Sequence, residues 1–323
     1  MKLSRRKASV TDPPTSPVLR LLVLVLVVGV LAFAGIYYQD QHVSAGPSMI
    51  DRQTQSAEAA VKKAPNNVGA RLELAGAYQS AKRMDDALAQ YKVILQADKK
   101  NRTALLGSGR ILIAEGDLKA ASAAYHRITD ISAKGEFAAA DPQLEEAHYF
   151  LGSILVTQGK NKEALTELGA ALKIDKTDSD ALYLMGVAQL KAGQPLLAVS
   201  ALRQALLFVP TGWCEPYSQL ALAYGKLGSA IQATYASGMA DFCHKKPADA
   251  KRKLTTLITN KSPVAVDALL GLALMAETES NNTEAVSWYK QVLTLDRTNV
   301  SAISSLSRLG VTPTGSSTTQ GPS

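Results

Sequence analysis

The sequence predicts an all-α fold, a solenoid or superhelix of helix hairpins that follows a single N-terminal transmembrane helix. Two observations predict it, a repeat of small residues and one long apolar run. Alanines recur 34 residues apart at Ala87 and Ala121 and at Ala164 and Ala198, and 35 apart at Ala250 and Ala285. Four residues after each stands a large apolar or aromatic side chain: Tyr91, Tyr125, Leu168, Leu202, Leu254 and Tyr289. A period of about 34 residues with helical spacing inside it is typical of stacked helix hairpins.

The apolar run is Leu21–Tyr38, which contains no charged residue. At about 1.5 Å per residue it spans roughly 27 Å, close to the thickness of a bilayer core. Five basic residues and one acidic residue precede it, namely Lys2, Arg5, Arg6, Lys7, Arg20 and Asp12. The positive-inside rule therefore predicts a basic cytoplasmic tail over 1–20, a signal-anchor helix over 21–38 and an extracytoplasmic remainder that begins with a juxtamembrane linker over 39–50.

A cleaved signal peptide is the alternative interpretation of this segment. Ala32-Phe33-Ala34 and Val43-Ser44-Ala45 both carry small residues at the spacing that a signal peptidase requires. The apolar run is longer than the 7–15 residues that are usual for a signal peptide, which favours a retained anchor.

Charge and motifs argue against several classes of function. The net charge is +7, of which the first 20 residues carry +4, so the rest is nearly balanced and shows no basic footprint for nucleic acid. No phosphate-binding loop, serine elbow or paired-histidine motif occurs, and His244 beside Cys243 has no further metal ligand at a useful spacing. We therefore expect no enzyme activity, no cofactor, no metal site and no small-molecule substrate.

The helices can be placed in order from the apolar pattern and the turns. A first helix over 51–64 ends at Pro65, and four hairpins follow, with turns at Lys82-Arg83, Glu115-Gly116-Asp117, Gln158-Gly159-Lys160 and Ala192-Gly193. Within the hairpins the first helix carries L-G-x-x-L or L-A-x-x-Y, as at Leu151-Gly152 and Leu74-Ala75, and the second carries A-x-x-x-[YL]. This pattern resembles the tetratricopeptide repeat (TPR) family over residues 51–309. The resemblance implies a TPR solenoid that binds other proteins.

Two departures from the repeat occur. Between Ala121 and Ala164 nine extra residues fall in 130–143, which is either a functional insertion or a tolerated surface loop. Between Ala198 and Ala250 the excess of 18 residues suits one additional helix. The expected later helices are 214–227 and 229–243, hinged at Gly228, then 248–259, 264–277, 283–295 and a capping helix over 301–309. The segment 310–323 is expected to be a disordered tail.

The two cysteines, Cys214 and Cys243, lie at similar distances from the Gly228 hinge on opposite arms of an antiparallel pair. A disulfide between them is one possibility, and two buried thiols are the other.

If the family resemblance holds, a partner lies on the concave face formed by the first helices. The candidate binding residues on this face are Arg110, Glu146, Tyr149, Asp180, Tyr183 and Val187. A face of this composition suits an extended peptide or a helix, and the alternative is that these residues are merely solvated. The function predicted is a membrane-tethered protein–protein interaction scaffold. The alternatives are a non-catalytic accessory subunit of an envelope enzyme or maturation complex, and a secreted TPR protein released by signal cleavage.

Overall fold

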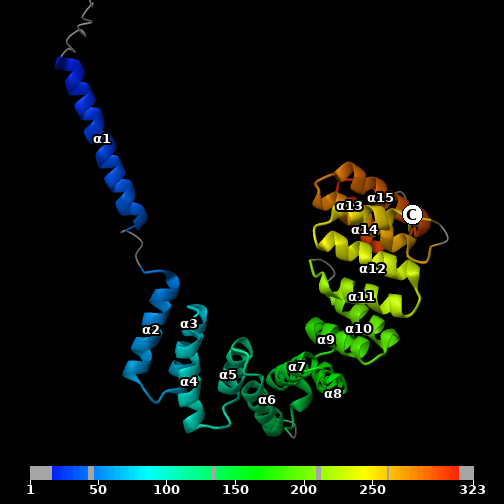
Figure 1. Cartoon of the computed structure of the whole chain (residues 1–323), viewed down its shortest axis with the longest axis horizontal. Helices are drawn as coiled ribbons and strands as arrows, with labels where there is room; N and C mark the ends of the chain where they lie inside the picture. The colour runs from blue at the N-terminus through cyan, green and yellow to red at the C-terminus, as the bar shows by residue number, and fades with distance from the viewer. Residues whose placement is uncertain (1–16, 43–46, 133–134, 209–211, 260–261, 313–323) are drawn as a thin grey trace, which may run out of the picture. The chain divides into compact units, whose positions relative to one another are not determined.

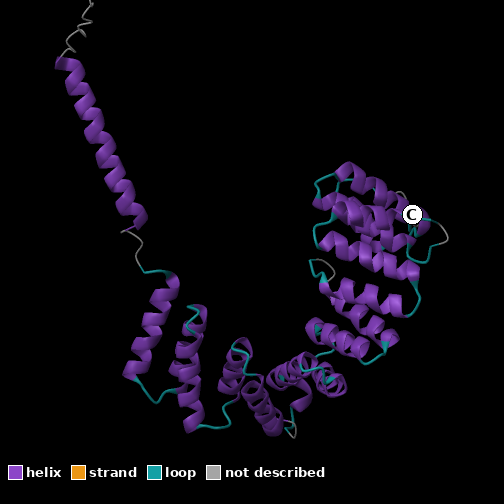
Figure 2. Ribbon diagram, in the orientation of Figure 1, coloured by secondary structure: helices purple, strands orange, loops and turns teal. Residues whose placement is uncertain are grey.

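The computed structural model describes residues 17–42, 47–132, 135–208, 212–259 and 262–312. Within these residues the chain forms sixteen α-helices and one short 3₁₀ helix and no strand (Figure 2). From residue 102 onward each helix packs on the next, so the predicted all-α repeat of helix hairpins is confirmed. The chain divides into two compact units, 1–90 and 91–323, and each is described by itself.

The first unit begins with the apolar helix α1, Pro17–His42 (Figure 1). Its segment Leu21–Tyr38 has a mean hydropathy of 2.6 and none of it is buried. The helix is therefore long and apolar enough to cross a membrane or to act as a signal sequence. It extends four residues into the expected linker, because no helix-breaking residue occurs before Gly46-Pro47. Most of the basic tail and the second cleavage candidate lie outside the described residues.

Helix α2, Met49–Lys63, packs on α3, Val68–Ser80, in the first unit. It begins two residues before the predicted start because Ser48 caps it. The Ser48 hydroxyl accepts a hydrogen bond from the Asp51 backbone N–H at 3.1 Å, and the Asp51 carboxylate accepts one from the Ser48 N–H at 3.1 Å. This reciprocal capping box satisfies two N–H groups that the helix itself leaves unpaired.

The second unit holds a run of paired helices. Helix α4, Met84–Ala97, contains the boundary between the units, and the helices after it are α5 (Arg102–Ala114), α6 (Leu118–Ser132), α7 (Pro142–Thr157), α8 (Asn161–Ile174), α9 (Ser179–Lys191), α10 (Pro195–Phe208), α11 (Glu215–Lys226), α12 (Ala230–Cys243), α13 (Pro247–Thr255), α14 (Ala265–Thr278), α15 (Asn282–Leu295) and α16 (Val300–Arg308). The tail predicted over 310–323 lies outside the described residues from residue 313 onward.

One contact recurs between the two helices of a hairpin. A glycine of the first helix lies against the large side chain that follows the repeating alanine of the second helix. A Cβ placed on Gly186 would lie 2.6 Å from Cγ of Leu202, and a Cβ on Gly152 would lie 2.6 Å from Cγ of Leu168. The second-helix alanines, such as Ala198, are fully buried. The close approach of the two backbones therefore explains both the glycines and the alanine repeat.

Helix α12 belongs to two hairpins. It packs on α11 as the second helix of that pair, and it packs on α13 as a first helix. A Cβ on Gly238 of α12 would lie 3.0 Å from Cδ2 of Leu254 on α13, which is the glycine contact of an ordinary hairpin. Helix α12 also contacts α14, just as α7 contacts α9. The repeat thus changes phase at α12, and this accounts for the additional helix.

Helix α13 ends at Thr255, four residues before the predicted end. The hydroxyls of Thr255 and Thr256 donate to the carbonyl oxygens of Lys251 and Lys253, both at 2.7 Å. Two successive β-branched residues that bond back to the preceding turn weaken the continuation of a helix.

The insertion before α7 is held against α5. Asp141 caps α7 by accepting from the N–H of Gln143 at 3.0 Å, and its carboxylate also pairs with the Arg102 guanidinium. Arg102 donates a second hydrogen bond, of 2.6 Å, to the Ser132 hydroxyl. Both ends of the insertion are therefore tied to the first residue of α5, whereas residues 133–134 lie outside the described part of the chain.

Candidate functional site

The candidate binding residues lie on the first helices α5, α7 and α9. Arg110 on α5 and Glu146 on α7 form an ion pair, with 3.4 Å between Nε and Oε1. The Arg110 side chain is 52 % exposed, so this pair is accessible to a partner and is only weakly stabilising on its own. The structure thus brings together two residues that are 36 positions apart in the sequence.

Tyr149 on α7 lies beside the charged start of α9. Its ring packs edge-on against Phe150, with 5.1 Å between the ring centroids. Burial raises the pKa of the Tyr149 hydroxyl to about 12, and the carboxylates of Asp180 and Asp178 add to this effect. The Tyr149 hydroxyl therefore stays protonated and can donate a hydrogen bond at any physiological pH.

Tyr183 on α9 contacts an aromatic residue that the sequence reasoning did not place in the site. Its ring centroid lies 5.2 Å from that of Trp213, which precedes α11, and the two rings are tilted by 57°. Burial, and next the charge of Glu215, raises the pKa of Tyr183. Two aromatic side chains thus meet between α9 and the start of α11, and both are partly exposed.

Val187 does not belong to the exposed face on which we expected it. Only 8 % of this residue is exposed, and it packs in the apolar core that α7, α8 and α9 share. Val156 of α7 and Leu168 of α8 belong to the same core, so this position of α9 faces the neighbouring helices rather than solvent. We therefore define the first-helix face by the five residues Arg110, Glu146, Tyr149, Asp180 and Tyr183.

A carboxylate recurs at one position of the first helices. In four hairpins it stands thirteen residues before the turn residue that has a positive φ: Glu146 before Gly159, Asp180 before Gly193, Glu215 before Gly228, and Asp267 before Ser280. The sequence reasoning missed Glu215 and Asp267. Counting back thirteen residues from each glycine turn would have found Glu215. The same count would have missed Asp267, because its turn has Ser280 in place of glycine.

Two further acidic residues lie close together here, Glu145 in the first turn of α7 and Asp178 just before α9. Burial raises the pKa of Glu145 to about 8, assisted by a hydrogen bond to Asp178 and by the charges of Asp178, Asp175 and Glu146. Among the described residues, Oε1 of Glu145 is buried without a hydrogen-bond partner. Protonation of Glu145 relieves the repulsion between its carboxyl group and the neighbouring acidic residues.

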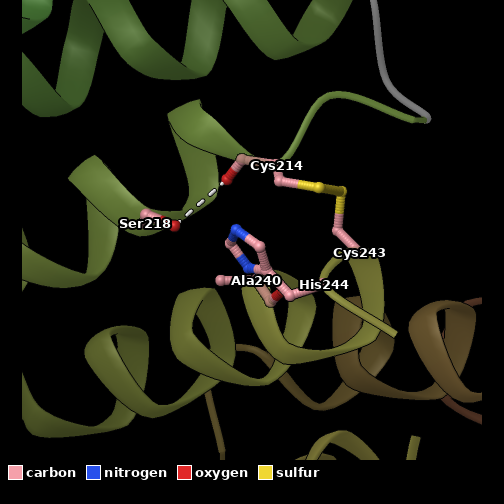
Figure 3. Close-up of a disulfide and its surroundings, with 5 residues drawn as sticks. All are labelled: Cys214, Ser218, Ala240, Cys243 and His244. Atoms are coloured by element: carbon pink, nitrogen blue, oxygen red, sulfur yellow. Dashed lines mark hydrogen bonds between the residues drawn. A yellow bond between two sulfur atoms is a disulfide. The ribbon is translucent and has the colours of Figure 1, made fainter. Parts of the chain in front are cut away.

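The cysteines do not belong to the first-helix face, although Cys214 directly follows Trp213. Cys214, just before α11, and Cys243, the last residue of α12, form a disulfide with 5.3 Å between their Cα atoms (Figure 3). The neighbouring His244 turns its Nδ1 to the carbonyl oxygen of Ala240, 2.7 Å away, in its own helix. Within the described part of the chain no group of three or more His, Cys, Asp or Glu side chains is placed to hold a metal ion.

Family models match several stretches of the chain. Models described as tetratricopeptide repeat match residues 80–141, and residues 55–102 and 235–300. A model described as TPR repeat matches residues 152–193. Among the stretches that these models leave unmatched, 194–234 holds α10, α11 and the start of α12, where the repeat changes phase.

Solved structures show a similar fold at low sequence identity. The TPR protein YrrB, whose structure is described as having an unusual peptide-binding site, is 20 % identical over 62 % of this chain and 97 % of its own, with a TM-score of 0.50. MamA is 23 % identical over 54 % of this chain and 96 % of its own, with a TM-score of 0.47. The C-terminal part of a TPR repeat-containing protein from Cytophaga hutchinsonii is 19 % identical over 78 % of this chain and 93 % of its own, with a TM-score of 0.48. Comparison with curated proteins finds no match.

Proposed function

Because this chain belongs to the tetratricopeptide repeat family, we propose that it is a membrane-tethered scaffold that holds another protein on its helical repeats. Repeats of this kind stack into an extended surface, and such surfaces bind protein segments. In this proposal α1 supplies the tether, the repeats supply the binding surface, and the chain contributes no catalytic residue of its own.

The observation that carries the proposal is the composition of the first-helix face. Tyr149 and Tyr183 present partly buried rings, Tyr149 near the carboxylate of Asp180 and Tyr183 near that of Glu215, and Trp213 extends the aromatic contact. Aromatic anchors next to a few charged groups are the usual composition of a binding hot spot. An extended peptide or a helix laid across α5, α7 and α9 would contact all five residues of this face. YrrB, which shares the fold, is described as a peptide-binding TPR protein, and that description supports a ligand of the same kind.

Two independent features support a location of the repeats outside the cytoplasm. The first is the excess of basic residues before α1. The second is the disulfide between Cys214 and Cys243, since disulfides persist in oxidising compartments and are rare in the cytosol. We therefore favour a retained anchor with its N-terminus in the cytoplasm.

A charge reversal on the first-helix face tests the proposal. Asp180→Lys changes an exposed side chain, so the fold should tolerate it, and Lys162→Glu reverses a charge on the second helix α8 as the matched control. Proteins that co-purify with the tagged full-length chain after crosslinking in cells would be quantified for each variant. Loss of one dominant partner with Asp180→Lys alone supports the proposal, and an identical partner set in both variants contradicts it.

A further inference from the structure

A cavity lies where the repeat changes phase, and none of the five residues of the first-helix face lines it. It has a volume of about 530 Å³ and is bounded by α10, α11, α12 and α14. Figure 1 shows these helices in succession in the second unit. The polar and aromatic side chains that line it are Arg203, Tyr217, Tyr224, Gln232, Tyr235 and Asp267. Because α12 completes one hairpin and opens the next, α14 reaches the same cavity as α10, and we call this space the α12 cavity.

Tyr235 lines the cavity together with the other polar groups. Burial raises the pKa of this tyrosine, and the hydroxyls of Tyr217 and Tyr224 and the charges of Asp267 and Arg203 all act on it. Three tyrosines and two charged residues, contributed by four helices, line this one space.

Asp267 is the acidic group of the cavity. Its side chain is accessible, and among the described residues it forms no hydrogen bond and no ion pair. Partial burial raises the pKa of Asp267. The nearby Arg203 guanidinium lowers this pKa but forms no salt bridge with Asp267. A carboxylate left unpaired among aromatic rings gains more from a cation than a carboxylate in open solvent does.

The chemistry of the lining selects a cation that is carried on a peptide. The faces of tyrosine rings attract ammonium and guanidinium groups, and Asp267 supplies the opposite charge. Arg203 and Asp267 oppose each other for either sign of charge, so the faces of the tyrosine rings favour the cation. Arg203 carries only donors, and the backbone carbonyl oxygens beside a bound side chain would satisfy them. Asp267 also occupies the repeat position that Glu146 and Asp180 hold on the first-helix face.

We propose that the α12 cavity binds a lysine or arginine side chain of a protein partner, with Asp267 pairing the cation and Arg203 binding the adjacent peptide carbonyls. This inference rests on the proposed function, since the side chain belongs to a protein that the solenoid holds. The α12 cavity is then a binding subsite separate from the first-helix face, and the partner supplies a basic side chain to it.

The test is a direct binding measurement on the full-length protein in detergent micelles at low salt. The probe is a fluorescein-labelled peptide, Gly-Ser-Gly-Lys-Gly-Ser-Gly, together with analogues that carry norleucine or glutamate in place of the lysine. Three variants are compared with the wild type: Asp267→Asn in the cavity, Asp180→Asn on the first-helix face and Glu163→Gln on α8. Thermal unfolding of each variant shows that the fold is retained.

The lysine peptide should bind about tenfold more tightly than the norleucine peptide, and Asp267→Asn should remove most of that preference. Glu163→Gln should leave the affinity unchanged, because this exposed carboxylate lies on another helix. Equal binding of all three peptides, or an Asp267→Asn variant with wild-type affinity, overturns the proposal. If only Asp180→Asn weakens binding, the cavity assignment fails whereas the proposed function of the first-helix face stands.

Discussion

Cys214 and Cys243 are joined by a disulfide, and so the start of α11 is fixed to the end of α12, with 5.3 Å between the two Cα atoms. Helix α12 is shared by two hairpins and contacts α11, α13 and α14. The covalent bond therefore lies at the one place where the repeat changes phase, and it holds the helix pair that forms two walls of the α12 cavity.

Removal of this bond should destabilise the middle of the solenoid. For a separation of 29 residues the chain-entropy model gives a loss of about 3–4 kcal/mol in the double variant Cys214→Ser, Cys243→Ser. Repeats couple mainly to their neighbours, so amide exchange should accelerate most in α11, α12 and α13. Exchange rates that are unchanged there, or two thiols that are alkylated in the wild type without reductant, would contradict this assignment.

Glycine-to-alanine substitutions should have opposite effects at two helical sites. At Gly186 the added Cβ would lie 2.6 Å from Leu202, so Gly186→Ala should cost about 1–3 kcal/mol through overpacking. At Gly76, within α3, nothing lies within 4 Å of the added Cβ, so Gly76→Ala should stabilise the protein by about 0.5–1 kcal/mol. Chemical denaturation of both variants measures the difference. Equal changes in the free energy of unfolding of the two variants would show that helix propensity alone decides the outcome.

The raised pKa of Glu145 should make the free energy of unfolding depend on pH. Burial raises the pKa of Glu145 from 4.5 to about 8, so the folded state holds a proton that the unfolded chain releases. This contribution to stability is complete below pH 4.5 and is lost as the pH rises toward about 8. In Glu145→Gln that loss should disappear, and denaturation midpoints across this range would show a flatter profile. Glu163→Gln, the control, should keep the slope of the wild type, and a Glu145→Gln variant with the same slope would refute the assignment.

The proposed topology makes a prediction for reporter fusions. A reporter that is active only in the cytoplasm should be inactive when it is fused after Ser323, and alkaline phosphatase fused there should be active. The protein should remain in the membrane fraction after carbonate washing if α1 is a retained anchor. An active cytoplasmic reporter would reverse the topology, and release into the soluble fraction would favour signal cleavage.

Much of the fold could be predicted because the packing contact is local. Gly152 and Leu168, or Gly186 and Leu202, are separated by 16 residues, so one hairpin repeats the same contact and leaves a readable period. Three turns lack the glycine that marks the others, and Lys82, Lys245 and Ser280 adopt a positive φ there. Their conformation is set by the surrounding helices rather than by the residue itself.

The sites were less predictable, because they depend on helices that are distant in the sequence. Val187 has the periodicity of an exposed residue and is buried by the approach of neighbouring helices. Trp213 meets Tyr183 across a loop, and Asp267 reaches the α12 cavity only because α12 serves two hairpins. No local pattern contains this information, since the phase change is a property of the stacked helices.

The central claim, that a protein partner lies on the first-helix face, is tested most directly by site-specific photocrosslinking in cells. A photoreactive residue would replace Arg110 or Asp180 in the full-length protein, and Lys119 or Lys162 on the second helices would serve as control positions, since all four side chains are exposed. We predict one dominant crosslinked protein from the two first-helix positions and none from the controls. Crosslinks of equal yield and identity at all four positions would contradict the account.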